Sequence, residues 1–333
     1  MKAFLLDKYQ KRAALRLTDV PEPDLRDDEV LVQIHAAGVN LLDVKIRDGE
    51  FKPILPYKLP LVLGHDLAGS VVRTGPKSRR FKVGDEVYSR VDDFRIGTFA
   101  ERIAVREGSL AAKPKSLSME EAASIPLVAL TAWQALVEIA KLRAGQKVFI
   151  QAGSGGVGTI AIQIAKHIGA YVATTASAGN ADWLKALGAD LVIDYKTQDF
   201  EAILRNYDVV LHSQDTKALE KSLNVLRPGG RLVSISGPAT PAFAAQVKAP
   251  WFLKPVFWAL SRSTYKKARQ RGVGFDFLFM KANGAQLQQI AALIEAGHIR
   301  PVVDRVYPFA DTNEAIAHVE SGRSKGKVVI KVK

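Results

Sequence analysis

The sequence predicts an α/β protein that joins a doubly wound parallel sheet to a β-rich domain. From residue 148 onward, short apolar runs alternate with helical patterns, which is typical of parallel strands connected by crossover helices. A glycine-rich loop follows the first of these runs directly. At roughly 150 residues per domain, the length of 333 residues fits two domains.

The composition excludes several other classes of protein. Hydrophobic residues make up 47% and charged residues 24% of the chain, so a disordered or fibrous protein is excluded. Without cysteine, the chain cannot form disulfides, Cys-ligated zinc sites, iron–sulfur clusters or a Cys nucleophile. The N-terminus carries charge at Lys2 and Asp7, so no signal peptide is expected. The apolar run 157–165 is about half the length of a membrane span, and we expect a soluble cytoplasmic enzyme.

Residues 1–121 are expected to form the β-rich domain. Val30–Ala36 and Leu67–Thr74 have strand patterns bounded by Gly, Pro or Asp. Prolines at positions 21, 23, 53, 56 and 60 leave no room for a long helix.

Residues 122–285 are expected to contain the parallel sheet. A helical pattern begins at Glu120 and continues through Ala140. The expected strands are Val148–Ile150, Tyr171–Ala173, Leu191–Ile193, Val209–Leu211 and Leu232–Ile235, with Phe275–Met280 as a further strand. Residues 286–333 then return to the first domain, with a helix at Gln286–Ala296 and strands at Val302–Phe309 and Val328–Val332 on either side of a helix at Thr312–Glu320.

The glycine-rich loop is the strongest chemical motif. Gly153, Ser154, Gly155, Gly156, Val157 and Gly158 follow the strand 148–150 and open an apolar helical pattern. Glycines at this position permit a tight turn and a close approach to a pyrophosphate, whose charge is stabilised by the N-terminus of the helix. The loop therefore predicts dinucleotide binding; the alternative is a tight turn with no ligand.

The residues after the second strand favour NADP over NAD. An NAD site usually has an acidic residue at the end of that strand, which binds the ribose hydroxyls. No acidic residue occurs between Thr159 and Ala181. Hydroxyls and cations accept a 2′-phosphate, and the candidates are Ser177, Asn180, Tyr195 and Lys196. The alternative is an NAD site that lacks the acidic residue.

A set of motifs resembles one family along nearly the whole chain. The motifs are Gly64-His65-Asp66-Leu67-Ala68-Gly69, Lys82-Val83-Gly84-Asp85-Glu86-Val87, Leu130-Thr131-Ala132-Trp133, the Gly153 loop and Ser321-Gly322-Arg323-Ser324-Lys325-Gly326-Lys327. In this order they resemble the medium-chain dehydrogenases/reductases, in the branch of zinc-independent quinone oxidoreductases and enone reductases. The resemblance implies a GroES-like catalytic domain and a Rossmann domain, with the active site in the cleft between them.

Departures from the zinc-dependent relatives bear on the chemistry. The resemblance places Asn40 where those relatives have a Cys ligand and His65 where they have a His ligand. Their third catalytic ligand and their Cys-rich lobe have no counterpart here. Because a catalytic zinc site needs three protein ligands, no metal is expected, and we interpret His65 as a remnant. Alcohol oxidation is disfavoured without a Lewis acid.

The resemblance also implies roles for individual residues. Asn40 would donate a hydrogen bond to a substrate carbonyl oxygen. Lys45 would stabilise an enolate or orient the nicotinamide; alternatively, it is a surface lysine paired with Asp43. Thr131 corresponds to a position near the nicotinamide, and Arg323, with Tyr195 and Lys196, to positions near the 2′-phosphate.

These features together predict an NADPH-dependent reductase of quinones or α,β-unsaturated carbonyl compounds, acting as a homodimer or monomer. In such substrates hydrogen-bond donors can replace a metal, because the carbonyl oxygen takes up the charge of the hydride. His212 is a candidate proton donor or a structural residue. The alternatives are another reduction on the same scaffold, such as that of an enoyl thioester, and a cofactor-bound membrane- or RNA-associated protein with little turnover.

A basic segment with aromatic residues stands apart from these motifs. Ten cationic and no acidic residues lie between Lys221 and Phe275, which is most of the net charge of +13. We consider three interpretations of residues 248–275, which belong to an insertion at about 240–274. In the first, the active-site cleft or a subunit contact is covered by the aromatic residues Trp251, Phe252, Phe257 and Trp258. In the second, residues 250–271 contact a membrane surface. In the third, the segment binds nucleic acid, although it contains no nucleic-acid-binding motif.

Overall fold

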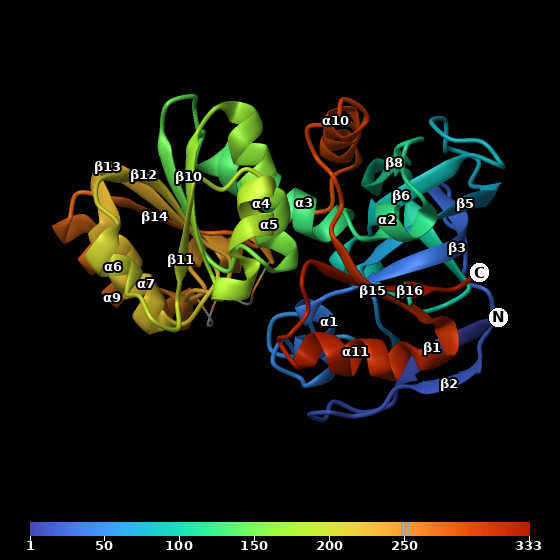
Figure 1. The fold of residues 1–333 in the computed structure, drawn as a ribbon. Coiled ribbons are helices and arrows are strands. Elements are labelled where there is room, and N and C mark those ends of the chain that lie inside the picture. Colours follow the sequence, from blue (N-terminus) through green and yellow to red (C-terminus); the bar gives the residue numbers. More distant parts are fainter. Residues whose placement is uncertain (248, 250, 252–253) are drawn as a thin grey trace. The chain divides into compact units, whose positions relative to one another are not determined.

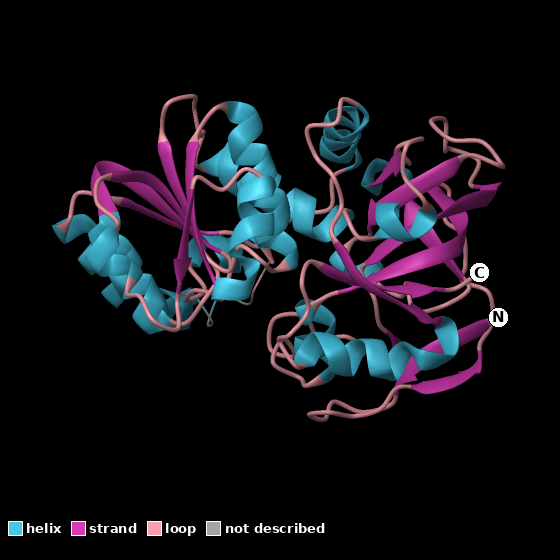
Figure 2. Cartoon of the chain, viewed as in Figure 1, coloured by secondary structure: helices cyan, strands magenta, loops and turns pink. Residues whose placement is uncertain are grey.

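The computed structural model describes residues 1–247, 249, 251 and 254–333. The chain divides into two compact units, residues 1–130 with 281–333 and residues 131–280. Both units contain helices and strands (Figure 2). The domain boundaries expected at residues 121 and 285 stay a prediction.

The first unit is built on two sheets. A three-stranded sheet has the order β2-β1-β4, and a larger sheet has the order β15-β16-β3-β5-β6-β8, with β7 also paired to β3. Its strands are β1 (Lys2–Leu6), β2 (Arg16–Asp19), β3 (Glu29–Val39), β4 (Leu61–Val62), β5 (Asp66–Thr74), β6 (Glu86–Arg90), β7 (Arg102–Arg106), β8 (Leu110–Ala112), β15 (Val303–Pro308) and β16 (Lys327–Lys331). Its helices are α1 (Leu41–Arg47), η1 (Asp93–Arg95), η2 (Glu107–Ser109), α2 (Met119–Ala123), α10 (Gly284–Glu295), η6 (Phe309–Asp311) and α11 (Thr312–Glu320).

The C-terminal residues complete the large sheet of the first unit. Strand β16 pairs in the antiparallel sense with β3, with Val328 opposite Val39, and in the parallel sense with β15. The helix α10 also packs on this unit, since a Cβ on Gly284 would overlap the carbonyl oxygen of Leu110. Strand β16 and helix α10 thus belong to the first unit.

The second unit contains a six-stranded sheet of the order β11-β10-β9-β12-β13-β14, and the strand pairs described in it are all parallel. Its strands are β9 (Lys147–Ile150), β10 (Tyr171–Ala176), β11 (Leu191–Asp194), β12 (Tyr207–His212), β13 (Leu226–Ser234) and β14 (Gly274–Phe277). Its helices are η3 (Gln134–Ile139), α4 (Gly156–Ile168), η4 (Ala178–Asn180), α5 (Ala181–Ala186), α6 (Phe200–Ile203), α7 (Thr216–Val225), α8 (Pro241–Gln246) and α9 (Lys254–Gln270). Helices α4 and α5 lie on one face of the sheet and α6, α7 and α9 on the other (Figure 1).

The strand order places a topological switch at β9. The chain passes from β9 to β10 on one side and later to β12 on the other. In open parallel sheets ligands bind outside the carboxyl ends of the strands at such a switch. The glycine-rich loop follows β9 directly, so it lies at this point.

Two predicted elements differ from the structure. The helical stretch 120–140 is divided into α2, α3 (Pro126–Trp133) and the π-helical η3, because the residue before a proline is disfavoured in a helix and Pro126 begins α3. The strand expected at 275–280 ends at Phe277.

The basic segment forms the helix α9 between β13 and β14. Of its aromatic residues, Phe257 is buried, whereas Trp251 is 79% and Trp258 54% exposed in the single chain. Phe252 lies outside the described residues. Among the described helices, none has the length and apolar character needed to cross a bilayer.

Candidate functional site

The glycines of the loop after β9 differ in what surrounds them. A Cβ on Gly153 would overlap Oγ1 of Thr174, and a Cβ on Gly158 would overlap the carbonyl oxygen of Ala152. Side chains are therefore excluded at both positions by the packing of the loop against β10 and against itself. Gly155 is different, since its Cβ would meet only one atom, at 3.4 Å. Gly155 thus presents bare backbone to an approaching ligand.

The helix α4 starts in this loop without a side-chain cap. Gly155 is the N-cap residue and no side chain accepts a hydrogen bond from the first turn, so the first N–H groups are available to an anion. The helix is held by its buried residues, which are Gly158, Thr159, Ile160, Ala161, Ile162, Gln163, Ile164 and Ala165. The loop and α4 fit the pyrophosphate of a dinucleotide.

The predicted 2′-phosphate residues of the second unit come together at one edge of the sheet. Ser177 and Asn180 follow β10, and Tyr195 and Lys196 follow the adjacent strand β11. The N–H of Tyr195 donates to the carbonyl oxygen of Ala176 at 3.3 Å, which joins the two strand ends. Tyr195 is exposed, as is Lys196.

Asn180 holds Ser177 in place. Its Nδ2 donates to Ser177 Oγ at 3.0 Å, and its Oδ1 accepts from Trp183 Nε1 at 3.1 Å. Asn180 is buried, so it holds the hydroxyl of Ser177 from the interior side. Two hydroxyl groups and an ammonium therefore lie at these strand ends.

Two other predicted cofactor residues belong to other elements of the chain. Thr131 is buried in α3, at the first residue of the second unit. Arg323 lies in the turn between α11 and β16, within the first unit.

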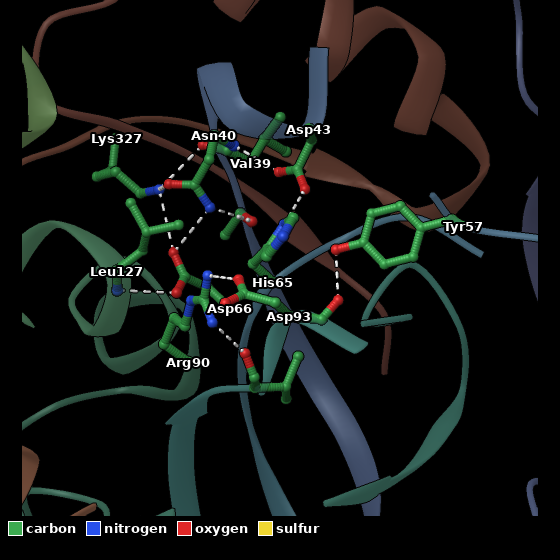
Figure 3. Close-up of polar contacts among 12 residues, drawn as sticks. Val39, Asn40, Asp43, Tyr57, His65, Asp66, Arg90, Asp93, Leu127 and Lys327 are labelled. Carbon is green, nitrogen blue, oxygen red and sulfur yellow. Dashed lines mark hydrogen bonds and ion pairs between the residues drawn. The ribbon is translucent and has the colours of Figure 1, made fainter. Parts of the chain in front are cut away.

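A buried polar network surrounds Asn40 in the first unit (Figure 3). Lys327 Nζ donates to Asn40 Oδ1 at 2.6 Å, to the carbonyl oxygen of Val39 at 2.9 Å and to Asp66 Oδ2 at 3.3 Å. Asn40 Nδ2 donates to the same Asp66 oxygen at 2.9 Å. The backbone N–H of Leu127 donates to the other oxygen, Oδ1, at 2.9 Å. The amide of Asn40 is thus fixed by a buried cation and a buried carboxyl.

Burial dominates the electrostatics of this network. It raises the pKa of the Asp66 carboxyl above its ordinary value, and the Lys327 ammonium and the Asn40 amide oppose that rise. A buried ion pair is stable only when its remaining hydrogen-bonding groups are satisfied. The contacts of Lys327 and Asp66 meet that condition.

Asp43 extends the network to His65. Its Oδ2 accepts from the backbone N–H of Asn40 at 2.8 Å, and its Oδ1 lies 2.6 Å from His65 Nδ1. Both side chains are fully buried. Lys45 instead lies at the surface of α1, where it pairs with Glu50 at 3.3 Å. The expected pairing of Lys45 with Asp43 is therefore wrong, because Asp43 faces inward to the imidazole.

The residues around Asn40 do not fit a zinc ion. The oxygen that a metal would need from Asn40 accepts from an ammonium, and the imidazole Nδ1 is paired with a carboxylate. His65 Nε2 makes no hydrogen bond to a described residue, but one nitrogen falls short of three ligands. The described part of the chain contains no cluster of three or more His, Asp or Glu side chains that could hold a metal.

His212, at the end of β12, has partners on both ring nitrogens. Its Nε2 lies 3.1 Å from the carbonyl oxygen of Asp215, so this nitrogen carries the proton, and its Nδ1 accepts from Ser234 Oγ at 2.8 Å. Burial lowers the pKa of His212 to about 4. The neutral ring therefore joins the ends of β12 and β13, and this geometry favours a structural role over proton donation.

The comparisons with known proteins agree with this arrangement. Models of the alcohol dehydrogenase GroES-like domain and of the zinc-binding dehydrogenase match residues 26–115 and 187–330. A 2-methylene-furan-3-one reductase from Solanum lycopersicum is 36% identical over 99% of this chain and 79% of its own length. The chain belongs to the medium-chain dehydrogenase/reductase family. The predicted family and its two-domain fold are thereby confirmed.

Other members of this family carry related names. The chloroplastic NADPH-dependent alkenal/one oxidoreductase of Arabidopsis thaliana is 33% identical over 99% of this chain and 79% of its own. The solved structure of the quinone oxidoreductase from Coxiella burnetii matches with a TM-score of 0.87 and 30% identity, over 100% of this chain and 99% of that one.

Sequence reasoning missed the partners that fix Asn40. Lys327 and Asp66 belong to motifs that resemble the family, but neither residue was assigned a role from the sequence. One signal was present: Lys327 is charged and directly precedes Val328-Val329-Ile330 in an apolar strand. A charged residue in such a strand is either at an edge or paired in the interior.

Proposed function

We propose that the protein is an NADPH-dependent reductase of quinones or α,β-unsaturated carbonyl compounds. The observation that carries the proposal is the edge of the parallel sheet where the uncapped glycine loop lies beside strand ends bearing hydroxyls and a cation. The names of the tomato, Arabidopsis and Coxiella relatives support the same chemistry.

The loop and the ends of β10 and β11 would hold the cofactor. The backbone of residues 153–158, including Ser154, Gly156 and Val157, would bind the pyrophosphate through the start of α4. Ser177 and Lys196, with Tyr195, would bind the 2′-phosphate. Thr131 and Arg323 are further candidates from the family resemblance. NADPH supplies a hydride when bound.

Asn40 is the proposed donor to the substrate carbonyl. Its Oδ1 and one N–H are held by Lys327 and Asp66, whereas its second N–H has only a contact of 3.4 Å with the carbonyl oxygen of Gly38. Such a long contact is weak, so this N–H, held in one direction by the other two contacts, is available to an oxygen on which negative charge develops. Donors held in advance stabilise that charge without a metal.

Lys45 is retained as a second catalytic candidate. Its pairing with Glu50 at the surface supports instead the interpretation of a surface lysine. Lys45→Met decides between the two: an unchanged kcat with a quinone removes Lys45 from the catalytic residues.

The test is turnover by the purified protein. NADPH is mixed with a panel of quinones and enones, and loss of nicotinamide absorbance is followed; NADH is the matched control for the 2′-phosphate. Turnover with NADPH exceeding that with NADH is expected. Turnover of enoyl thioesters alone, or of a simple alcohol with NADP⁺ alone, would contradict the proposal. Sedimentation of the same preparation distinguishes the homodimer from the monomer.

A further inference from the structure

The helix α9 presents a surface that the second unit leaves uncovered. Its buried residues are Phe257, Ser261, Thr264 and Ala268, which recur at helical spacing and form one stripe. Phe257 packs edge-on against Phe243 of α8, with ring centroids 5.9 Å apart. Tyr265 packs on Phe275 and Lys267 pairs with Glu220 beside this stripe, and the opposite side of the helix points away from the unit.

The exposed part of α9 is divided along the helix. We call eight of its exposed residues the α9 patch: the apolar Val256, Trp258, Ala259 and Leu260 in the first turns, and Lys254, Arg262, Lys266 and Arg269 around and after them. Half or more of Val256, Trp258 and Leu260 is accessible, at 50%, 54% and 58%. Val256 and Leu260 are neighbours on one flank of the helix, and Trp258 lies on the other flank.

Cations and an aromatic ring are combined within the patch. The guanidinium of Arg262 lies 5.0 Å from the centroid of the Trp258 ring. Tryptophan with Lys or Arg beside it is enriched at the boundary between lipid headgroups and acyl chains, because the ring is apolar with one polar edge.

The charge of the patch is not neutralised by its own unit. Elsewhere in the basic segment, Lys221, Arg227, Arg231 and Lys267 pair with Asp199, Asp208, Asp276 and Glu220. Lys254, Lys266 and Arg269 make no ion pair with any residue that the structure describes. The surface is thus both apolar and cationic.

We propose that the α9 patch docks the protein on an anionic lipid bilayer. The first turns of α9 enter the headgroup boundary with Val256 and Leu260 on one flank of the helix and Trp258 on the other, and the cations bind the lipid phosphates and carboxylates. Because the exposed apolar residues lie in the first turns and most of the cations after them, the first turns lie deepest in the interface and the later turns lie at the headgroups. Nucleic acid would satisfy the cations equally, but exposed Val and Leu side chains gain nothing from a polyanion. This inference does not depend on the proposed reductase activity.

The experiment measures sedimentation of the full chain with vesicles. One set consists of phosphatidylcholine, and the other also contains roughly one-third phosphatidylserine. Binding to the second set only, lost at high salt, is expected. A triple variant, Arg262→Gln, Lys266→Gln and Arg269→Gln, should bind about a hundredfold more weakly, at ~1 kcal/mol for each cation near the surface.

Two further variants separate the contributions. Lys115→Gln, Lys185→Gln and Lys217→Gln change three exposed lysines outside α9 and match the loss of charge, so their combination should bind nearly as the parent does. Trp258→Ser with Leu260→Ser should also weaken binding at least tenfold. Thermal unfolding checks that each variant is folded, since every changed residue is exposed.

Three outcomes would overturn the proposal. The first is equal loss of vesicle binding in the charge-matched control and the α9 triple variant. The second is unchanged binding in the Trp258 and Leu260 variant, which would indicate non-specific attraction. The third is displacement from vesicles by a short RNA together with tighter binding to that RNA, which would assign the surface to nucleic acid.

Discussion

Lys327 Nζ lies 2.6 Å from Asn40 Oδ1, although 287 positions separate the two residues in the chain. One belongs to the last strand of the protein and the other to the start of α1. The same ammonium contacts Asp66, so a single buried cation ties together three segments of the first unit. The geometry of the proposed donor therefore depends on the C-terminal strand.

Removing this cation should destabilise the protein strongly. Lys327→Met leaves the buried Asp66 carboxyl without its cation, and breaking a buried pair in this way costs about 3–5 kcal/mol. Lys331→Met on the same strand is the matched control, because Lys331 is 58% exposed and pairs only with Glu120 among the described residues; it should cost less than about 1 kcal/mol. Urea unfolding measures both. A similar loss of unfolding free energy in both variants would contradict the prediction that the buried ion pair of Lys327 stabilises the protein more than the exposed pair of Lys331.

Alanine at two glycines of the loop after β9 should have different effects on stability and on NADPH binding. Gly158→Ala forces a methyl group within 2.7 Å of Gly153 Cα, and such overpacking costs about 1–3 kcal/mol. Gly155→Ala has open space and a φ of −81° that alanine adopts freely. It should leave thermal unfolding unchanged and weaken NADPH binding about tenfold, as calorimetry would measure. Full NADPH affinity in Gly155→Ala would mean that no pyrophosphate approaches the loop there.

His212 should make stability depend on pH in the acid range. The pKa of its buried ring is lowered from 6.5 to about 4. Because the unfolded chain binds the proton more readily, the stabilisation is complete above pH 6.5 and falls by about 3 kcal/mol as the pH approaches 4. Unfolding of His212→Asn and the parent, compared across this window, measures the difference. A parallel pH dependence of the two proteins would assign the titration to another group.

An acidic residue at the end of β10 should reverse the choice of cofactor. Ser177→Asp puts a carboxylate where the 2′-phosphate is proposed to bind, and repulsion between the two should weaken NADPH binding roughly a hundredfold. NADH serves as the internal control, since it lacks the phosphate and should bind equally well or better. Fluorescence titration with both nucleotides measures the ratio. If NADPH and NADH weaken together, Ser177 supports the loop without facing the phosphate.

The parallel sheet could be predicted because its signals are local. The apolar run 148–150, the glycines after it and the apolar spacing of α4 lie within twenty-one consecutive residues, 148–168. Periodicity also located β3, β5, α11 and β16 to within a few residues. The break before Pro126 was missed since the pattern on either side is equally helical.

The network around Asn40 could not be predicted because its contacts are distant in sequence. Asp43 had two possible partners, Lys45 two residues away and His65 twenty-two away, and the pairing with the nearer one was wrong. In α1, residues two apart point to different sides of the helix. Only the fold of β5 against β3 shows that His65 faces Asp43.

The position of β16 also has a consequence for synthesis of the chain. This strand lies between β3 and β15, so the larger sheet of the first unit is incomplete until residues 327–331 have been translated. Residues 131–280, by contrast, are all available before that point. During translation, residues 131–280 should therefore complete their fold before the first unit does. The N-terminal strands of the first unit cannot form the complete sheet until β16 has been synthesised.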